Sequence, residues 1–276
     1  MIDLGYGPQP GRLPNVDGVG KVDALLLSHG HRDHAGGIAM LSKIGNPPIY
    51  ATEIVARRFP SGINVRALPM SGTAEVLGVR IGTGRSGHAP GGVWLHLALG
   101  DGLLYMGDNS SESILYAYDP PPRAGTVILD GSYGSNDATL AECQKKFDAL
   151  LESSAVLLPV PADGRGPEIA LYFARKGCPA LRIDETMRSS LRRMADTERA
   201  SLREGVAAEL ARIAETAGAI DGPRGIILAT RADATEGESA RLVQQWENAT
   251  DPVIVFSGDL TPGTPAERLV KNGRAR

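Results

Sequence analysis

The sequence predicts an α/β protein whose two halves are built differently. In the first half, short apolar runs bounded by turns follow one another with few long helices between them, which predicts a mixed or antiparallel sheet with helices packed outside. In the second half, buried-strand runs alternate with helical patterns, which predicts a separate α/β unit. The chain has 276 residues, of which 42% are hydrophobic, so it can bury a sizeable core in one large domain or two smaller ones.

The first half begins with a loop and continues as a series of short strands. Residues 1–21 are rich in Gly and Pro, which predicts a loop with at most a strand end at 1–4. A buried strand at 22–27 and a helix that opens at 35–41 flank a short polar segment. The further predicted strands are 49–51, 64–68, 75–81, 93–99, 103–106 and 126–129.

From about residue 135 the predicted helices and strands alternate. Helices are predicted where apolar residues recur at helical spacing, and strands where a short apolar run stands between turns. In order, these elements are helix 138–152, strand 155–160, helix 168–176, strand 180–183, a long helix 186–217, strand 225–229, helix 239–248 and strand 252–256. The Met and Leu stripe of the long helix indicates a face directed to the core rather than a cofactor contact.

Charge and hydropathy narrow the classes of function. The net charge of −3 gives no basic tail that would indicate nucleic-acid binding by charge alone, although a local positive groove is compatible with a neutral total. No apolar run approaches membrane-spanning length, and the N-terminus lacks the basic start and apolar core of a signal peptide. We therefore expect a cytoplasmic protein with no membrane partner.

The segment between the first predicted strand and helix indicates a metal site. Its six positions, 29–34, hold three imidazoles and one carboxylate. His29 and His31 can point one way from a turn, whereas Asp33 and His34 continue into the helix, so the segment can offer ligands to two adjacent cations. Mixed imidazole and carboxylate ligation suits zinc, manganese or iron. The alternative is a histidine-rich surface turn that titrates near neutrality.

Two later residues can complete this site. His88 lies in a loop rich in Gly and Pro, and Asp108 follows the strand 103–106, where a carboxylate can bridge two metal ions. Taken singly, each has a simpler explanation, a solvated loop histidine or a turn-forming residue. Together with the cluster at 29–34 they predict a six-ligand site. His96 alternates with apolar residues inside a predicted strand and is assigned to structure.

Residues 82–87 match the GxGxxG fingerprint of dinucleotide-binding proteins but do not predict a nicotinamide site. The fingerprint requires a helix whose N-terminus receives the pyrophosphate. Here Pro90, Gly91 and Gly92 are incompatible with that helix, so a nicotinamide cofactor is rejected.

The ordered set of His29, His31, Asp33, His34, His88 and Asp108 resembles the metallo-β-lactamase superfamily of metal-dependent hydrolases. Further segments resemble its β-CASP nuclease branch, which includes the mRNA 3′-end-processing endonuclease and bacterial ribonucleases. These segments are 126–134 with the acidic residue Asp130, 156–168 with a Gly-Arg-x-x-Glu pattern, and 253–268. The resemblance implies an incomplete αββα sandwich over 1–134, a β-CASP-like α/β insert over 135–258 and a C-terminal return segment over 259–276.

The same resemblance implies a nuclease that cleaves RNA phosphodiester bonds with a metal-activated hydroxide. Two Zn²⁺ ions are expected, with Mn²⁺ as the alternative. The ligands implied for the first ion are His29, His31 and His88, and those for the second are Asp33 and His34, with Asp108 bridging the two. Asp33 would also orient the hydroxide. Asp130 is the second residue to which the resemblance assigns a catalytic role.

Two departures from the family pattern keep alternatives open. Asp3-Leu4-Gly5 stands almost at the start, where the family has a preceding strand hairpin, and no histidine follows His96, whereas the family supplies two late histidines. Either the chain is shortened at both ends, or water or another group such as Asp259 completes the second metal. The alternatives are a non-catalytic or impaired subunit of this fold, with a partner chain or second copy, and a hydrolase of small esters or thioesters.

Overall fold

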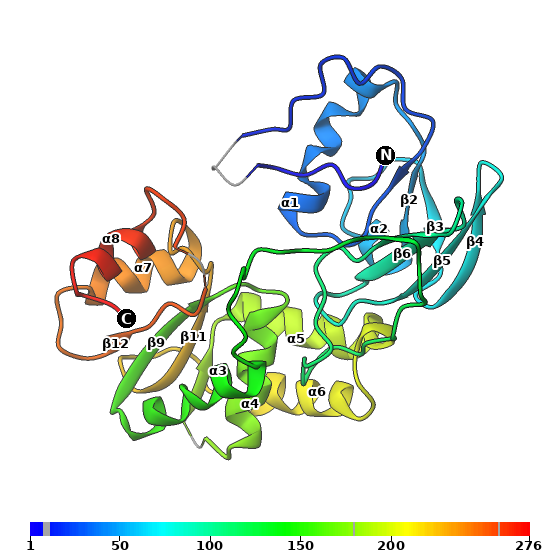
Figure 1. The fold of residues 1–276 in the computed structure, drawn as a ribbon. Helices are drawn as coiled ribbons and strands as arrows, with labels where there is room; N and C mark the ends of the chain where they lie inside the picture. Colours follow the sequence, from blue (N-terminus) through cyan, green and yellow to red (C-terminus); the bar gives the residue numbers. More distant parts are fainter. Residues whose placement is uncertain (8–11, 179, 259) are drawn as a thin grey trace. The chain divides into compact units, whose positions relative to one another are not determined.

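The computed structural model describes residues 1–7, 12–178, 180–258 and 260–276, which form two compact units (Figure 1). The first unit comprises Met1–Asn136 together with the segment Glu198–Arg203. The second comprises Asp137–Thr197 and Glu204–Arg276. The domain limits predicted from the sequence remain a prediction. Within the described residues no helix is both long and apolar enough to cross a membrane.

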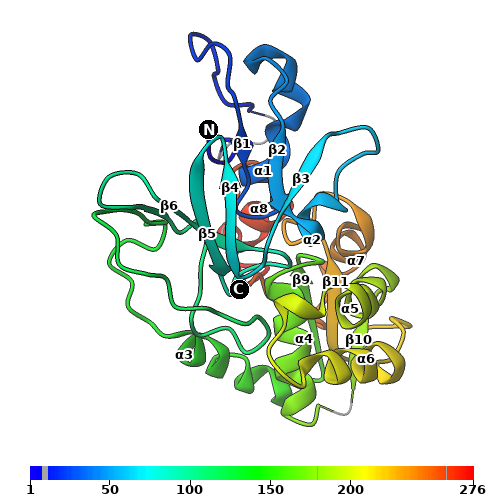
Figure 2. The ribbon, with the colours of Figure 1, turned by 90° about the vertical axis from the view of Figure 1, so that its right-hand side faces the viewer.

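The strands of the first unit form two sheets. One is parallel, with the order β1-β2-β3, and the other has the order β4-β5-β6-β7-β8, antiparallel except where β7 pairs with β8. The strands are β1 (Leu25–Leu26), β2 (Ile49–Thr52), β3 (Val65–Leu68), β4 (Gly72–Val76), β5 (Val79–Arg85), β6 (Val93–Leu97), β7 (Leu103–Tyr105) and β8 (Thr126–Ile128). Figure 2 shows β1 to β6 from the side.

The parallel sheet is packed on both faces. On one face Leu26 and Tyr50 share a core with Ile81 and Leu95 of the second sheet. On the other face the sheet packs against helices, listed as α1 (Arg32–Ala35), the 3-10 helix η1 (Gly36–Ile44) and α2 (Glu53–Ala56). This order of helix, sheet and sheet confirms the predicted α/β class.

The second unit is a parallel sheet with helices on both faces. Its strand order is β10-β11-β9-β12. The strands are β9 (Ala155–Val160), β10 (Leu181–Ile183), β11 (Gly225–Thr230) and β12 (Val253–Ile254). The helices are α3 (Leu140–Lys145), η2 (Asp148–Glu152), α4 (Arg165–Arg175), α5 (Glu185–Thr197), α6 (Val206–Thr216), α7 (Gly237–Trp246) and α8 (Pro265–Lys271). Helices α7 and α8 cover one face, and α4 and α5 the other (Figures 1 and 2).

Four predicted elements take a different form in the structure. The predicted strand 75–81 is a hairpin of β4 and β5, turned by Leu77 and Gly78 at φ values of 52° and 78°, which suit a tight hairpin turn. The predicted helix 138–152 is divided into α3 and η2, and the predicted helix at 35–41 is mostly 3-10. The long helix 186–217 is interrupted between α5 and α6, because Leu202 pairs with Tyr116 of the first unit and the short 3-10 helix η3 (Arg199–Ser201) precedes it.

The GxGxxG segment has a structural explanation in the second sheet. Gly82 and Gly84 lie inside β5, and Gly84 pairs with Trp94 on β6. A Cβ atom on Gly84 would lie 2.2 Å from Cζ2 of Trp94, so the glycine makes room for the indole ring. The indole N–H donates to the carbonyl of Asp119 at 2.7 Å. This glycine pattern therefore serves strand packing.

Candidate metal centre

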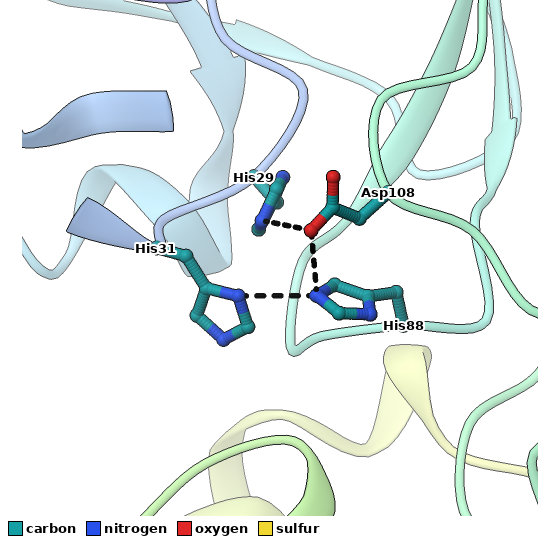
Figure 3. Close-up of side chains that lie close together, drawn as sticks. All are labelled: His29, His31, His88 and Asp108. Carbon is teal, nitrogen blue, oxygen red and sulfur yellow. Dashed lines mark hydrogen bonds and ion pairs between the residues drawn. The ribbon is translucent and has the colours of Figure 1, made fainter. Parts of the chain in front are cut away.

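The structure brings all six predicted ligands together in two groups that share Asp108. The first group is His29, His31, His88 and Asp108, and the second is Asp33, His34 and Asp108. In each group the potential ligand atoms lie within 4.8 Å of one another. Figure 3 shows the four side chains of the first group converging from three separate stretches of chain.

The first group has the spacing and the chemistry of a divalent-cation site. Nε2 of His88 lies 3.3 Å from Oδ2 of Asp108 and 3.1 Å from Nδ1 of His31, and Nε2 of His29 lies 3.9 Å from the same carboxylate oxygen. Ligands held at 2.0–2.1 Å around a tetrahedral zinc ion stand about 3.3 Å apart. Nε2 of His29 is buried and has no hydrogen-bond partner among the described residues. Since buried polar atoms normally have partners, this nitrogen fits a site for a bound cation.

The second group is more open to solvent. Nε2 of His34 lies 3.1 Å from Oδ1 of Asp108 and 3.7 Å from Oδ2 of Asp33. The side chain of Asp33 is 64% exposed, whereas that of His29 is 1% exposed. The Asp33 side of the cluster is therefore accessible to solvent.

The ligands stand on loops at the ends of strands. The segment that carries His29 follows β1 and is held by the carbonyl of Ser28, which accepts from Val93 N–H at 2.9 Å. The loop of His88 follows β5 and is closed by Ser86 N–H, which donates to the carbonyl of Gly92 at 3.0 Å. Asp108 follows β7. Loops held by a rigid sheet are the usual place for binding residues.

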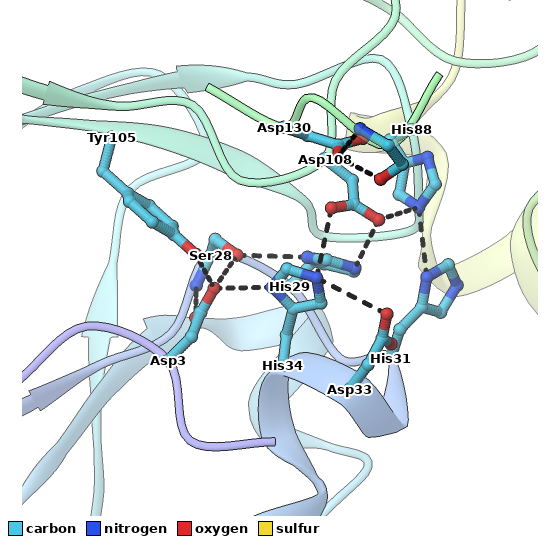
Figure 4. A network of polar contacts seen from close by, with 11 residues as sticks. Asp3, Ser28, His29, His31, Asp33, His34, His88, Tyr105, Asp108 and Asp130 are labelled. Atoms are coloured by element: carbon cyan, nitrogen blue, oxygen red, sulfur yellow. Dashed lines mark hydrogen bonds and ion pairs between the residues drawn. The ribbon is translucent and has the colours of Figure 1, made fainter. Parts of the chain in front are cut away.

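Asp3 connects both ligand groups, a role that the sequence analysis missed. Its Oδ2 accepts from Nδ1 of His34 at 2.7 Å, from Ser28 Oγ at 2.6 Å and from the hydroxyl of Tyr105 at 2.8 Å (Figure 4). Because Ser28 gives its single proton to the carboxylate, its oxygen accepts from Nδ1 of His29 at 3.1 Å. Asp3 thus holds Nδ1–H of His34 directly and that of His29 through Ser28. Nε2 of each ring is left facing the cluster.

Gly5 lets the N-terminal segment reach the cluster. Backbone N–H groups of Leu4 and Tyr6 donate to the carbonyls of His34 and Arg32, so residues 3–7 cross the start of α1. A Cβ atom on Gly5 would lie 1.7 Å from the carbonyl oxygen of Asp33. The Asp3-Leu4-Gly5 pattern was the available signal, because only glycine permits this approach.

Burial and neighbouring charges separate the pKa values of the histidines. Burial lowers the pKa of His29 well below its usual value, and the nearby histidines lower it further. Burial also lowers the pKa of His88. For His34, burial opposes the charge, but hydrogen bonds to Asp108 and Asp3 raise the pKa to about 10. Burial would raise the pKa of Asp108, but the hydrogen bond with His34 lowers it. Burial thus favours the neutral form of His29 and His88, whereas the carboxylates of Asp3 and Asp108 favour the charged form of His34.

The structure does not bring the predicted catalytic residue Asp130 into either ligand group. Asp130 is exposed and accepts from the backbone N–H of Ser132 at 2.9 Å and from its hydroxyl. Its charge still acts on the pKa of His88, and Figure 4 shows it on the side of His88 and Asp108. His96 lies on β6, opposite Gly82, outside both groups. Asp259 lies outside the described residues.

Comparison with known proteins identifies the family. The model of the metallo-β-lactamase superfamily matches residues 1–150, more than half of the chain. The chain belongs to this superfamily. The family predicted from the sequence is therefore confirmed, and the His/Asp cluster of this metallo-β-lactamase domain indicates a divalent metal.

Relatives of this superfamily member carry nuclease and termination-factor names. Ribonuclease TTHA0252 of Thermus thermophilus is 32% identical over 193 residues, 57% of this chain and 44% of the relative. Transcription termination factor FttA of Cenarchaeum symbiosum is 27% identical over 223 residues, which cover 63% of this chain and 35% of the relative. Endoribonuclease YSH1 of Kluyveromyces lactis is 24% identical over 226 residues, which cover 63% of this chain and 29% of the relative. These relatives agree with the predicted β-CASP nuclease branch. The chain spans less than half the length of each.

Proposed function

We propose that this metallo-β-lactamase-fold chain is a metal-dependent hydrolase that cleaves RNA phosphodiester bonds. The observation that carries the proposal is the convergence of His29, His31, Asp33, His34, His88 and Asp108 into two groups around one shared carboxylate. The ribonuclease names of relatives support RNA as the substrate. We propose two ions, zinc rather than manganese, because four of the six donors are imidazoles. A cytoplasmic location remains a prediction, and so does association with a partner chain or with a second copy of this chain.

The chain's own residues suit this chemistry. Divalent ions held here would lower the pKa of a water molecule and offset charge on a phosphodiester. The buried His29 and the carboxylate Asp108 would fix the ions, while Asp33, exposed at the rim, would orient the attacking water. Asp130, near His88, would act on the same side. Asp3 would keep His29 and His34 turned toward the ions.

The absence of histidine after His96 favours a second candidate, a subunit that binds metal without turnover. A hydrolase of small esters or thioesters would use the same ligands and differ in substrate. Both alternatives are separated from the nuclease by the same experiment.

The test measures metal content and cleavage of end-labelled RNA by the purified chain. We expect two zinc equivalents per chain and cleavage that a chelator stops. The His31→Ala variant should lose the zinc equivalent of the first group and, with it, cleavage. His96→Ala is the matched control, because this histidine lies outside both groups, and it should keep metal and cleavage. Bound metal without cleavage of RNA would favour the non-catalytic subunit, and cleavage of a thioester alone the small-substrate hydrolase. A wild-type chain that binds no metal would overturn the proposal.

A further inference from the structure

Six residues from the second half of the sequence lie in the first unit, against the loops that carry the candidate ligands. The segment Glu198–Arg203 follows α5 and precedes α6 in the chain, but its contacts place it with Met1–Asn136. The helical pattern of the sequence would have continued through it. In this segment 3-10 and tertiary hydrogen bonds take the place of α-helical ones.

Ser201 holds the loop of His88. Its hydroxyl accepts from the backbone N–H of Gly91 at 2.7 Å, three positions after His88. Ser201 is only 2% exposed, so this hydrogen bond is shielded from water. The loop is otherwise rich in glycine and proline, and its own closure rests on few backbone bonds.

Ser201 and Arg203 also hold the loop of Asp108. The carbonyl of Ser201 accepts from Ala117 N–H at 2.9 Å, and Arg203 N–H donates to the carbonyl of Leu115 at 3.0 Å, on either side of the bridge that pairs Leu202 with Tyr116. The guanidinium of Arg203 donates to two further carbonyls of this loop, those of Ser113 at 2.5 Å and Ser111 at 3.1 Å. Ser111 lies three residues after Asp108.

Glu198 reaches the third loop through Arg58. Its carboxylate pairs with the guanidinium of Arg58 at 3.3 Å, and Glu198 is almost fully buried. The side chain of Arg58 lies against the backbone between His29 and His31, where a Cβ atom on Gly30 would be 3.0 Å from its Cδ. Arg58 is also close enough to contribute to the lowered pKa of His29.

We propose that Glu198–Arg203 is a positioning segment that fixes the three ligand loops relative to one another. This inference rests on the proposed function, since it concerns the same cation site. Ligands on separate loops bind a metal well only if the loops are held to within fractions of an ångström. One segment that hydrogen-bonds or packs against all three loops supplies that constraint. The contacts described above reach the backbone of the loops of His88 and Asp108 directly and the backbone beside His29 through Arg58.

The test uses the full chain with Ser201→Ala and Arg203→Met variants. Loss of an indirect partner of a metal ligand typically costs 10–100-fold in affinity, so we expect Zn²⁺ affinity, measured by competition with a chromogenic chelator, to fall by about 10-fold or more in each variant. The visible spectrum of the Co²⁺-loaded protein should change, since it reports ligand geometry. Ser201→Thr, which keeps the hydroxyl, should restore both. Glu204→Gln, one residue beyond the segment and exposed, is the matched control and should behave as wild type.

Amide hydrogen exchange on the metal-free protein gives a readout that needs no ion. In Ser201→Ala we expect faster exchange in 86–92 and 107–119, with exchange in β9 and β11 unchanged, which also shows that the variant is folded. Unchanged affinity, spectrum and exchange in both variants of a metal-binding wild-type protein would overturn this inference alone. A wild-type protein that binds no metal would overturn the proposed function, and this inference with it.

Discussion

Each unit buries a polar side chain just after a strand, and the two side chains are partnered in opposite ways. In the second unit Asp184 follows β10 and is 8% exposed. Its Oδ1 accepts from Met187 N–H at 2.7 Å, and its Oδ2 accepts from the N–H and the hydroxyl of Thr230 at 2.6 and 2.7 Å. In the first unit His29 is only 1% exposed, but its Nε2 has no hydrogen-bond partner among the described residues.

This difference separates a structural polar group from a binding one. Asp184 accepts from the first turn of α5 and from the end of β11, so both of its carboxylate oxygens have partners inside the chain. Nε2 of His29 has no hydrogen-bond partner among residues 1–7, 12–178, 180–258 and 260–276, and three other potential metal ligands lie around it. Burial alone therefore says little about function, whereas burial with an unused lone pair does.

The largest expected effect comes from removing the carboxylate that both ligand groups share. Asp108→Asn should lose both metal ions, and RNA cleavage should fall by more than the roughly 100-fold that losing an indirect partner costs. Asp33→Asn should lose only the second ion, because Asp33 belongs to one group. Metal content by elemental analysis measures both, with the turn residue Asp101→Asn as control. Equal metal loss in the Asp33 and Asp108 variants would refute the inference that both ligand groups share Asp108.

Removing Asp184 should affect stability and leave the metal site intact. Asp184→Ala leaves two buried backbone N–H groups and the Thr230 hydroxyl without their acceptor, so we expect the free energy of unfolding to fall by about 3 kcal/mol. Urea unfolding of the variant beside Asp196→Ala, an exposed change on α5, measures this cost. If Asp184→Ala lowers the Zn²⁺ affinity and leaves the free energy of unfolding unchanged, the contrast drawn between Asp184 and His29 is wrong.

An intermediate effect is expected for Asp3, which connects the two groups. Asp3→Asn removes the carboxylate oxygen that accepts from His34, Ser28 and Tyr105. Zn²⁺ affinity should drop by roughly 10–100-fold at both sites, as for other partners of metal-binding histidines. Chelator competition gives the value, with the exposed Asp17→Asn as the control. An unchanged affinity would mean that Asp3 contributes only to folding.

The smallest expected effect is a pH dependence of metal affinity. The pKa of His34 is raised to about 10, so below that pH the metal-free protein carries a proton that must leave before Nε2 can bind a cation. Affinity of the second site should therefore rise with pH, by at most about tenfold per unit. Titrations between pH 6.5 and 8.5 in buffers of different ionisation enthalpy also count the protons released. No proton release would contradict the assignment of the charge to His34.

Four of the six candidate ligands could be found in the sequence because they lie within one six-residue run. His88 could be found because its loop is rich in Gly and Pro, and Asp108 because it follows a predicted strand. The α/β class could be predicted for the same reason, since apolar spacing is local. The hairpin of β4 and β5 was missed because Leu77 is not a usual residue for a turn at positive φ. The prediction of one long helix over 186–217 was wrong. Apolar residues continue at helical spacing through 198–203, but backbone groups of Ser201 and Arg203 form hydrogen bonds with the loop of Asp108.

The type and order of the ligand residues, and the alternation of strands and helices, were already readable in the one-dimensional chain, because side-chain chemistry and periodicity are local properties. The role of Asp3 and the place of Glu198–Arg203 emerged only from the folded protein. Their bonds run to Ser28, to Gly91 N–H and to carbonyls such as that of Ser113. Backbone donors and acceptors are the same at almost every residue, so no sequence pattern marks which of them a distant segment will contact.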